Sequence, residues 1–392
     1  MTVPGPWLRA CAAFGAVATG VAAASGPLGI THRALVGIAL PPLVAVAIAA
    51  WHSYPRLRLP ASGAVAAFVG ASVTWWIAPV HVTFAAVAFA GSAVTAALAF
   101  RGDAGTAGPW RDYVTLTKPR IMSLLLVTGA AGMFVGAEGV PPLADLGVML
   151  LGLGLACGGA SALNHLLDRD IDRLMGKRTE RRPVAAGRVA PARALEFGLA
   201  LSAASFVLLA SLANVLTAVL ALVGNLFYVL VYTRWLKRST TQNIVIGGAA
   251  GAVPPLVGYA AATGALALPA LWLFLVVFLW TPPHFWALAL LLKDNYANAR
   301  VPMLPVVRGD RETARQILVY SVVLVAFTLA VTPWLGPLYG AAAAVLGGAF
   351  LWLAWALGRD LSRRRAALLF HYSLAYLALL FAAAAIDPVV LS

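Results

Sequence analysis

Three oxygen-bearing side chains recur at every fourth position in one segment of this 392-residue chain: Asn164, Asp168 and Asp172. On a helix this spacing places all three on one face, with roughly 6 Å of rise between neighbours. Mg²⁺ prefers oxygen ligands and commonly takes one or two carboxylates together with substrate phosphates. A basic segment follows at 173–182, and arginine forks fit phosphate oxygens. The pattern therefore favours a magnesium diphosphate held at the end of a long apolar segment.

A simpler interpretation of these residues is a solvated helix end with local ion pairs. The candidate pairs are Asp168 with Arg169 and Asp172 with Arg173, but adjacent residues do not face each other on a helix. We therefore favour the metal site for the stripe. Asp170 lies off the stripe, and for it we favour solvation. For the basic segment, plain topology-setting charge stays an alternative to phosphate binding.

A second unusual segment places Pro282 and Pro283 in the middle of an apolar run, followed by His284 and flanked by Trp280 and Trp286. Two prolines are expected to break or kink a helix, and broken helices at membrane depth usually line a cavity. His284 is then a candidate for contacting a large planar ligand or for supplying a proton. The alternative is a structural histidine that bonds a backbone carbonyl freed by the prolines.

The composition is that of a membrane protein. Hydrophobic residues make up 61% of the chain and charged residues 11%, and the mean hydropathy is +0.88. Repeated apolar runs near the length of a bilayer crossing indicate transmembrane helices. The net charge of +14 lies in short loops between these runs, so we expect no nucleic-acid partner, because the chain has no basic soluble domain to bind one. Residues 7–25 fit a first membrane helix or a signal peptide, and we favour the helix.

We predict an all-α, polytopic bundle of about thirteen helices. The predicted spans are 7–25, 34–51, 62–78, 82–100, 121–137, 144–164, 194–212, 214–232, 244–262, 269–291, 316–333, 336–357 and 366–386. With the N-terminus in the cytoplasm, the cytoplasmic segments hold all 28 Lys and Arg residues except Arg33. The positive-inside rule then predicts a cell-membrane protein with cytoplasmic active-site loops and an external C-terminus.

The polar, glycine-rich stretch at 101–118 is the expected boundary between two modules. Residues 1–110 would form an accessory segment of about four spans, and residues 111–392 the catalytic part. The accessory segment contains His32, His52 and His81, which match no motif. We expect it to handle a ligand, to dock a partner, or to be an accessory bundle alone, and we favour the last.

Several motifs together resemble the UbiA superfamily of intramembrane prenyltransferases, over about 115–386. They are Leu116-Thr117-Lys118-Pro119-Arg120; Asn164-x-x-x-Asp168-x-x-x-Asp172 with Arg178-Thr179-x-x-Arg182-Pro183; Tyr232-Thr233-x-x-Leu236-Lys237-Arg238; Asn243-Ile244-Val245-Ile246-Gly247-Gly248; Thr281-Pro282-Pro283-His284-Phe285-Trp286; and Val301-Pro302-Met303-Leu304-Pro305-Val306. The fourth and fifth motifs resemble the heme-directed branch in particular. The resemblance implies a nine-helix core, to which about four N-terminal helices are added.

The resemblance implies farnesyl transfer from farnesyl diphosphate to a vinyl group of heme B, with addition of water, to give heme O. It implies that the reaction depends on Mg²⁺. The implied metal ligands are Asn164, Asp168, Asp172 and Asp294. The implied diphosphate ligands are Arg120, Arg178, Lys237, Arg238 and Asn164. The implied catalytic residues are Asp168, Asp172, Lys237 and His284, with His284 and Trp286 on the heme side. A heme A synthase or a terminal oxidase assembly is an expected partner beside the lipid bilayer.

One departure from the family pattern concerns the second acidic site. The family usually has an acidic residue directly before the tyrosine that matches Tyr296, where this chain has Asn295, with Asp294 one step earlier. Two alternatives to the heme-directed reaction remain. One is prenylation of an aromatic or chlorin acceptor. The other is a membrane transporter, although a transporter would place charges within its spans and show a repeated half.

Overall fold

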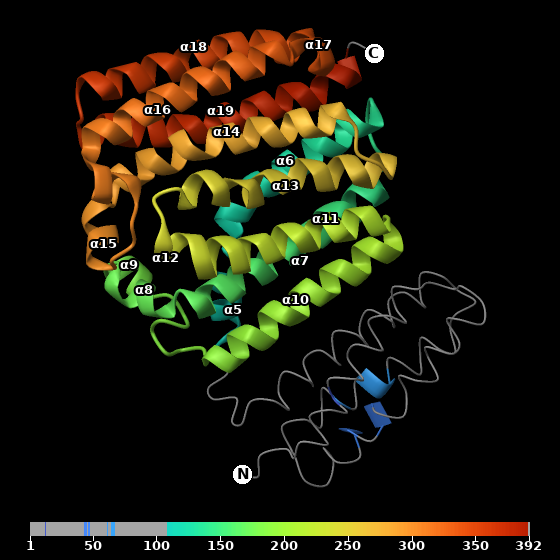
Figure 1. Ribbon diagram of the computed structural model, residues 1–392. Coiled ribbons are helices and arrows are strands. Elements are labelled where there is room, and N and C mark those ends of the chain that lie inside the picture. Colours follow the sequence, from blue (N-terminus) through green and yellow to red (C-terminus); the bar gives the residue numbers. More distant parts are fainter. Residues whose placement is uncertain are drawn as a thin grey trace. The chain divides into compact units, whose positions relative to one another are not determined.

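The computed structural model describes residues 108–390 and, before them, only positions 12, 43–44, 46–47, 61 and 64–66. All the regular elements of residues 108–390 are helices (Figure 1). In chain order they are α5 (Trp110–Thr117), α6 (Pro119–Ala137), α7 (Leu143–Leu167), α8 (Arg169–Leu174), α9 (Lys177–Glu180), α10 (Pro191–Leu212), α11 (Val215–Leu226), the π-helix η2 (Phe227–Leu236), α12 (Lys237–Ser239), α13 (Asn243–Thr263), α14 (Leu268–Leu291), α15 (Lys293–Asn298), α16 (Leu304–Ala330), α17 (Thr332–Leu335), α18 (Pro337–Arg359) and α19 (Arg363–Val390).

Within the described residues, nine helices are long and apolar enough to cross a membrane. They correspond one to one with the nine predicted spans after residue 115, which confirms the all-α prediction. The seventh starts at Leu304 rather than at 316, and α11, η2 and α12 together extend the fourth to Ser239. Apart from the few positions named above, the four earlier predicted spans lie outside the described residues, as do Arg33, His32, His52 and His81.

The described chain divides into two compact units. The second unit comprises Arg120–Leu153, Leu167–Arg181 and Leu220–Ser392. In it α14, α16, α18 and α19 lie side by side (Figure 1), and their facing sides form a hydrophobic core that includes Tyr339, Phe350, Tyr376 and Phe381. This core gives the site a rigid support, because close-packed interiors yield little to local strain.

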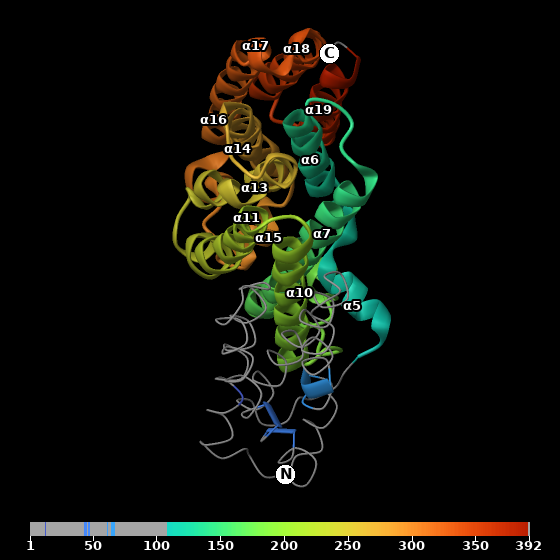
Figure 2. The same ribbon diagram turned by 90° about the vertical axis from the view of Figure 1, so that its right-hand side faces the viewer.

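Small residues let α6 approach α13 closely (Figure 2). Gly129 and Gly132 on α6 face Gly258 and Pro255 on α13, and a side chain at any of these glycines would meet its neighbours at less than contact distance. Close backbone approach through small residues is typical of membrane helix pairs, which gain association from packing rather than from the hydrophobic effect. The pair fixes the middle of α13, around Pro255 and Gly258.

The prolines of α14 do not interrupt it. The helix runs from Leu268 to Leu291 through Pro282 and Pro283, so the predicted break is absent. The hydroxyl of Thr281 donates a hydrogen bond to the carbonyl of Val277 at 2.8 Å. Packing against α13, α16 and α19 supports the helix where Pro282 and Pro283 supply no amide donors.

The first unit contains α5, the Gly154–Leu166 part of α7, and Arg182–Val219. Leu116 of α5 is completely buried in a small cluster with Ala162 and Val189. Ser161 donates a 2.6 Å hydrogen bond to the carbonyl of Leu116. These contacts fix the end of α5, where the Leu116-Thr117-Lys118-Pro119-Arg120 motif lies.

Candidate active site

Asp168 and Asp172 are both fully buried, at the junction where α7 ends and α8 begins. The amide of Asp172 donates to the carbonyl of Asp168 at 2.8 Å, so helical hydrogen bonding continues across the junction and the carboxylates stay one turn apart. The predicted single helix through Asn164, Asp168 and Asp172 is thus two helices, because α7 ends at Leu167. Burying two carboxylates costs free energy unless cations or ligands compensate.

The compensating cations come from the segment that follows the π-helix η2. Lys237 donates to Asp168 at 2.5 Å and is itself 9% exposed. Arg238 lies 3.9 Å from the same carboxylate. A π-helix changes the angular spacing of its residues and frequently marks a functional site. Here it ends directly before Lys237 and Arg238, and so sets the direction in which these two side chains leave the backbone.

Asp170 is a residue whose role the sequence interpretation missed. Arg238 donates two hydrogen bonds to its carboxylate, both at 2.7 Å, and a third to the carbonyl of Leu167. The hydrogen bond from Arg238 lowers the pKa of Asp170 to about 2. Because a lowered pKa stabilises the pair above the ordinary carboxyl pKa, the pair persists at neutral pH and is lost only as the pH falls towards 2. Asp170 therefore holds Arg238 beside the buried carboxylates.

Asn164 belongs to the first unit, where its side-chain oxygen accepts a 2.7 Å hydrogen bond from Lys118. Lys118 follows α5 in the left-handed conformation, with φ of 51°. Lys118 occurs in the Leu-Thr-Lys-Pro-Arg motif, but it was not among the predicted ligands. The motif itself was the signal that could have identified it.

Three predicted ligands lie apart from these ion pairs. Arg120, Arg178 and Asp294 are exposed, and among the described residues none of them forms an ion pair. The described residues also contain no group of three or more His, Cys, Asp and Glu side chains arranged to hold a metal. Asp168 and Asp172 are thus a two-carboxylate donor set, which fits Mg²⁺ only when a substrate supplies further oxygens.

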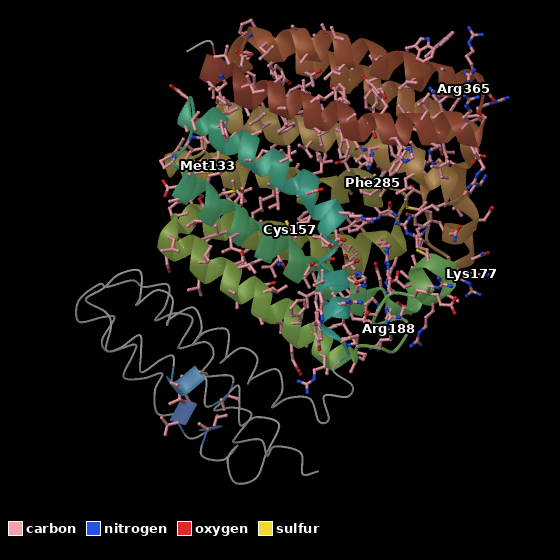
Figure 3. The ribbon with its side chains drawn as sticks, turned by 180° about the vertical axis from the view of Figure 1, so that it is seen from behind. Met133, Cys157, Lys177, Arg188, Phe285 and Arg365 are labelled. Atoms are coloured by element: carbon pink, nitrogen blue, oxygen red, sulfur yellow. The ribbon has the colours of Figure 1, made fainter. Side chains whose placement is uncertain are left out.

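Asn295, which replaces the usual acidic residue, has a structural contact. Its side-chain amide donates to the carbonyl of Met175, at the end of α8. An aspartate could not donate this hydrogen bond. Asn295 therefore ties α15 to the segment that carries Asp172, at the end of the second unit where Lys177 and Arg365 also lie (Figure 3).

His284 is 5% exposed and lies between aromatic rings of α14 and α19. It stacks on Trp280 at 4.3 Å and on Phe370 at 4.8 Å between ring centroids. Its Nδ1 lies 2.6 Å from the hydroxyl of Ser373, which itself donates to the carbonyl of Phe370 at 2.7 Å. With the hydroxyl proton directed to Phe370, Nδ1 is the donor to Ser373 and Nε2 keeps its lone pair. Nε2 has no hydrogen-bond partner among the described residues.

Trp286 faces away from this arrangement. It is two residues beyond His284, roughly 200° around the helix, and its ring meets Tyr320 of α16 edge-on at 5.2 Å. The two predicted heme-side residues therefore contact different helices, α19 and α16.

Asn243, the first residue of α13, is a second polar side chain that we had not assigned to the site. It is completely buried, and neither its amide nitrogen nor its oxygen has a hydrogen-bond partner among the described residues. Buried polar groups are nearly always paired. Asn243 lies six residues after Lys237 in the chain. Its unpaired side chain is therefore a candidate to bind a substrate oxygen.

Comparisons with known proteins place this geometry in context. Residues 125–382 match the UbiA prenyltransferase family. Protoheme IX farnesyltransferase from Symbiobacterium thermophilum is 54% identical over 281 residues, which are 71% of this chain and 94% of that protein. The enzyme of the same name from Synechocystis sp. is 53% identical over 285 residues, 71% of this chain and 89% of that protein.

Two solved structures share the fold at low sequence identity. A digeranylgeranylglyceryl phosphate synthase has a TM-score of 0.60 and 16% identity, covering 71% of this chain and 98% of its own. A UbiA homolog from Archaeoglobus fulgidus, bound to GPP and Mg²⁺, has a TM-score of 0.54 and 17% identity, covering 69% of this chain and 99% of its own.

Proposed function

Because the chain belongs to the UbiA prenyltransferase family, we propose that it is a protoheme IX farnesyltransferase, or heme O synthase. It transfers the farnesyl group of farnesyl diphosphate to a vinyl group of heme B, with addition of water, and releases diphosphate. The observation that carries the substrate assignment is the identity of more than half to farnesyltransferases of that name over nearly their full length. The chain is a multi-pass membrane protein.

The donor set at the α7–α8 junction supports Mg²⁺ as the cofactor. Asp168 and Asp172 would hold it, since they are buried carboxylates on neighbouring turns. Asn164 and Asp294 remain candidate Mg²⁺ ligands, and only the resemblance to the family supports them. When bound, Mg²⁺ would act as a Lewis acid that neutralises charge on the departing diphosphate.

The cations beside these carboxylates would bind the diphosphate oxygens. Lys237 and Arg238 are already held there by Asp168 and Asp170, so little reorganisation is needed when the leaving group gains charge. Arg120 and Arg178 are exposed and would add contacts at the rim. Asn243 would donate to, or accept from, a substrate oxygen.

His284 would act on the heme side. With Nδ1 committed to Ser373, its Nε2 lone pair is free to orient the porphyrin or to take a proton. The stacked Trp280 and Phe370 hold the imidazole plane. Ser373 is thus a positioning residue for His284.

Ser373→Ala should lower kcat by about tenfold, because it removes the hydrogen bond that fixes the His284 tautomer, a loss of about 1 kcal/mol or more. The KM for farnesyl diphosphate should stay unchanged. Ser373→Thr, which keeps the hydroxyl, should recover much of the rate. The measurement is steady-state kinetics with both substrates varied. An unchanged kcat in Ser373→Ala would show that the contact is only structural.

Deleting residues 1–110 should leave a core that still transfers farnesyl. Every recognised motif lies after residue 115, and removing an even number of spans keeps Lys118 and Arg120 on the predicted cytoplasmic side. Heme O production and the membrane level of the truncated protein are measured together. A well-inserted but inactive core would show that the segment contributes to the site, with His32, His52 and His81 the first residues to replace. If the truncated protein still made heme O but no longer worked with a heme A synthase or a terminal oxidase assembly, the segment would be assigned to partner docking.

The test of the function is incubation of the purified protein with heme B, farnesyl diphosphate and Mg²⁺, with the product identified by mass. Heme O supports the proposal. Transfer to an aromatic or chlorin acceptor instead would assign another prenyltransferase activity. No transfer to any acceptor would favour the transporter.

A further inference from the structure

A pocket separate from the carboxylate cluster opens between α14, α16 and the residue before α13. Counted with the open space at its mouth, its volume is about 360 Å³. Its lining comprises Gln242, Trp286, Leu304, Arg308, Glu312, Gln316 and Tyr320. All of these residues belong to the second unit. The first turns of α16 supply Leu304 and Arg308, and the chain kinks there at Gly309, which has a φ of 79°.

The indole of Trp286 is the polar group that points to a ligand. Its side chain is 3% exposed, and its Nε1 has no hydrogen-bond partner among the described residues. Tyr320 packs edge-on against the ring, so the ring position is fixed. Trp286 lines the pocket, and a ligand held there is a candidate acceptor for this N–H.

The charges around the pocket select an anionic acceptor. Arg308 contributes an exposed cation, and Gln242 contributes an amide. The one carboxylate in the lining, that of Glu312, accepts a 2.8 Å hydrogen bond from Gln316 and lies 3.5 Å from Arg315. Arg308 also attracts this carboxylate electrostatically, so the two arginines around Glu312 carry more positive charge than its carboxylate carries negative charge. An arginine and an indole with an unpaired N–H, both lining one pocket, fit a carboxylate, whose two oxygens can accept from both.

We propose that this pocket binds a propionate carboxylate of the heme acceptor. The inference rests on the proposed function, and it specifies which end of the acceptor is held. Protoheme carries its vinyl groups on one side of the ring and its propionates on another. Anchoring a propionate at the charged end of α16 would leave the vinyl side free to face the apolar interior where the farnesyl group reacts. An anionic lipid headgroup presents similar oxygens and is the competing source of the ligand.

The experiment measures binding of heme B and of heme B dimethyl ester, in which both propionates are esterified, to the full-length protein in neutral-lipid nanodiscs. The variants are Trp286→Phe, which keeps the ring packing, and Arg308→Gln. Trp272→Phe and Arg311→Gln are the matched controls. Trp272 also has a buried N–H without a partner but lies outside the pocket, and Arg311 is exposed on the same helix.

In the unmodified protein and in both controls, heme B dimethyl ester should bind about tenfold more weakly than heme B. A factor of this size is the effect of one charge-assisted hydrogen bond. In Trp286→Phe and Arg308→Gln, heme B should bind about tenfold more weakly, and esterification should cost less than it costs the unmodified protein, because one of the two contacts is already lost. Farnesyl diphosphate affinity should be the same in all five proteins, which also reports that each variant is folded.

Equal sensitivity to esterification in the pocket variants and the controls would overturn the proposal. A loss that appears only when anionic lipid is added to the nanodiscs would assign the pocket to a lipid headgroup instead. Failure of the proposed function would look different. In that case the unmodified protein would bind no heme B and form no heme O, whatever the state of the pocket.

Discussion

Asp168→Asn and Asp172→Asn should each lower farnesyl transfer by about a thousandfold or more while the protein stays in the membrane. Each change removes one of two buried carboxylates at the α7–α8 junction. A divalent cation supplies several kcal/mol of stabilisation to a leaving group, and about 4 kcal/mol corresponds to a thousandfold in rate. The measurement is the initial rate of heme O formation at saturating Mg²⁺, normalised to the folded protein in the membrane.

Asp170→Asn is the matched control for these two variants. It removes a carboxylate from the same turn, but one that is exposed and pairs with Arg238. Exposed pairs contribute about 0.2–1 kcal/mol, so the rate should fall by less than about tenfold. Full activity of Asp168→Asn or Asp172→Asn would contradict the metal assignment, and equal losses in all three variants would show that the effect is one of charge at the junction alone.

Lys237→Met should lower both the stability of the protein and its affinity for farnesyl diphosphate. Breaking a buried ion pair by removal of one partner costs about 3–5 kcal/mol, and Lys237 and Asp168 form such a pair at 2.5 Å. Loss of a charged hydrogen bond to the diphosphate should cost a further 1.5–3 kcal/mol of binding free energy, by order of magnitude. Thermal unfolding and a titration with farnesyl diphosphate measure the two effects separately.

The double variant Lys237→Met/Asp168→Asn separates stability from binding. Removing both charges should recover much of the stability lost in Lys237→Met, because an uncharged buried pair carries a smaller desolvation cost, whereas diphosphate binding should stay weak. Arg178→Ala should weaken binding without any loss of stability, since Arg178 is exposed on α9. If Lys237→Met lowered heme affinity and left diphosphate affinity unchanged, the role given to Lys237 would be wrong.

The helices could be predicted well from the sequence because apolar length alone determines a membrane span. All nine predicted spans after residue 115 occur as helices, and the stripe of Asp168 and Asp172 keeps its one-turn spacing. The prolines misled the prediction for α14. Neighbouring helices support that helix through both prolines, and such tertiary support is invisible in the local sequence.

The partners of the charged residues could not be predicted, because they lie far away in the chain. Asp168 pairs with Lys237, and Asp170 with Arg238, each across nearly seventy positions. Spacing within the Asp168 segment indicated only which carboxylates share a face. It gave no signal that the residue off that face, Asp170, orients an arginine. Likewise, Asn295 reads as a weakened acidic site in the sequence, and only its contact with Met175 shows what an amide does there.

The central claim is that Asp168 and Asp172 bind the diphosphate of the substrate through Mg²⁺. The most direct measurement is the affinity for farnesyl diphosphate with and without Mg²⁺, in the unmodified protein and in Asp172→Asn, by equilibrium titration in nanodiscs without heme. We predict that Mg²⁺ tightens binding to the unmodified protein by about tenfold or more, the effect of one charge-assisted interaction, and that Asp172→Asn loses this dependence. Equal dependence on Mg²⁺ in both proteins would contradict the assignment.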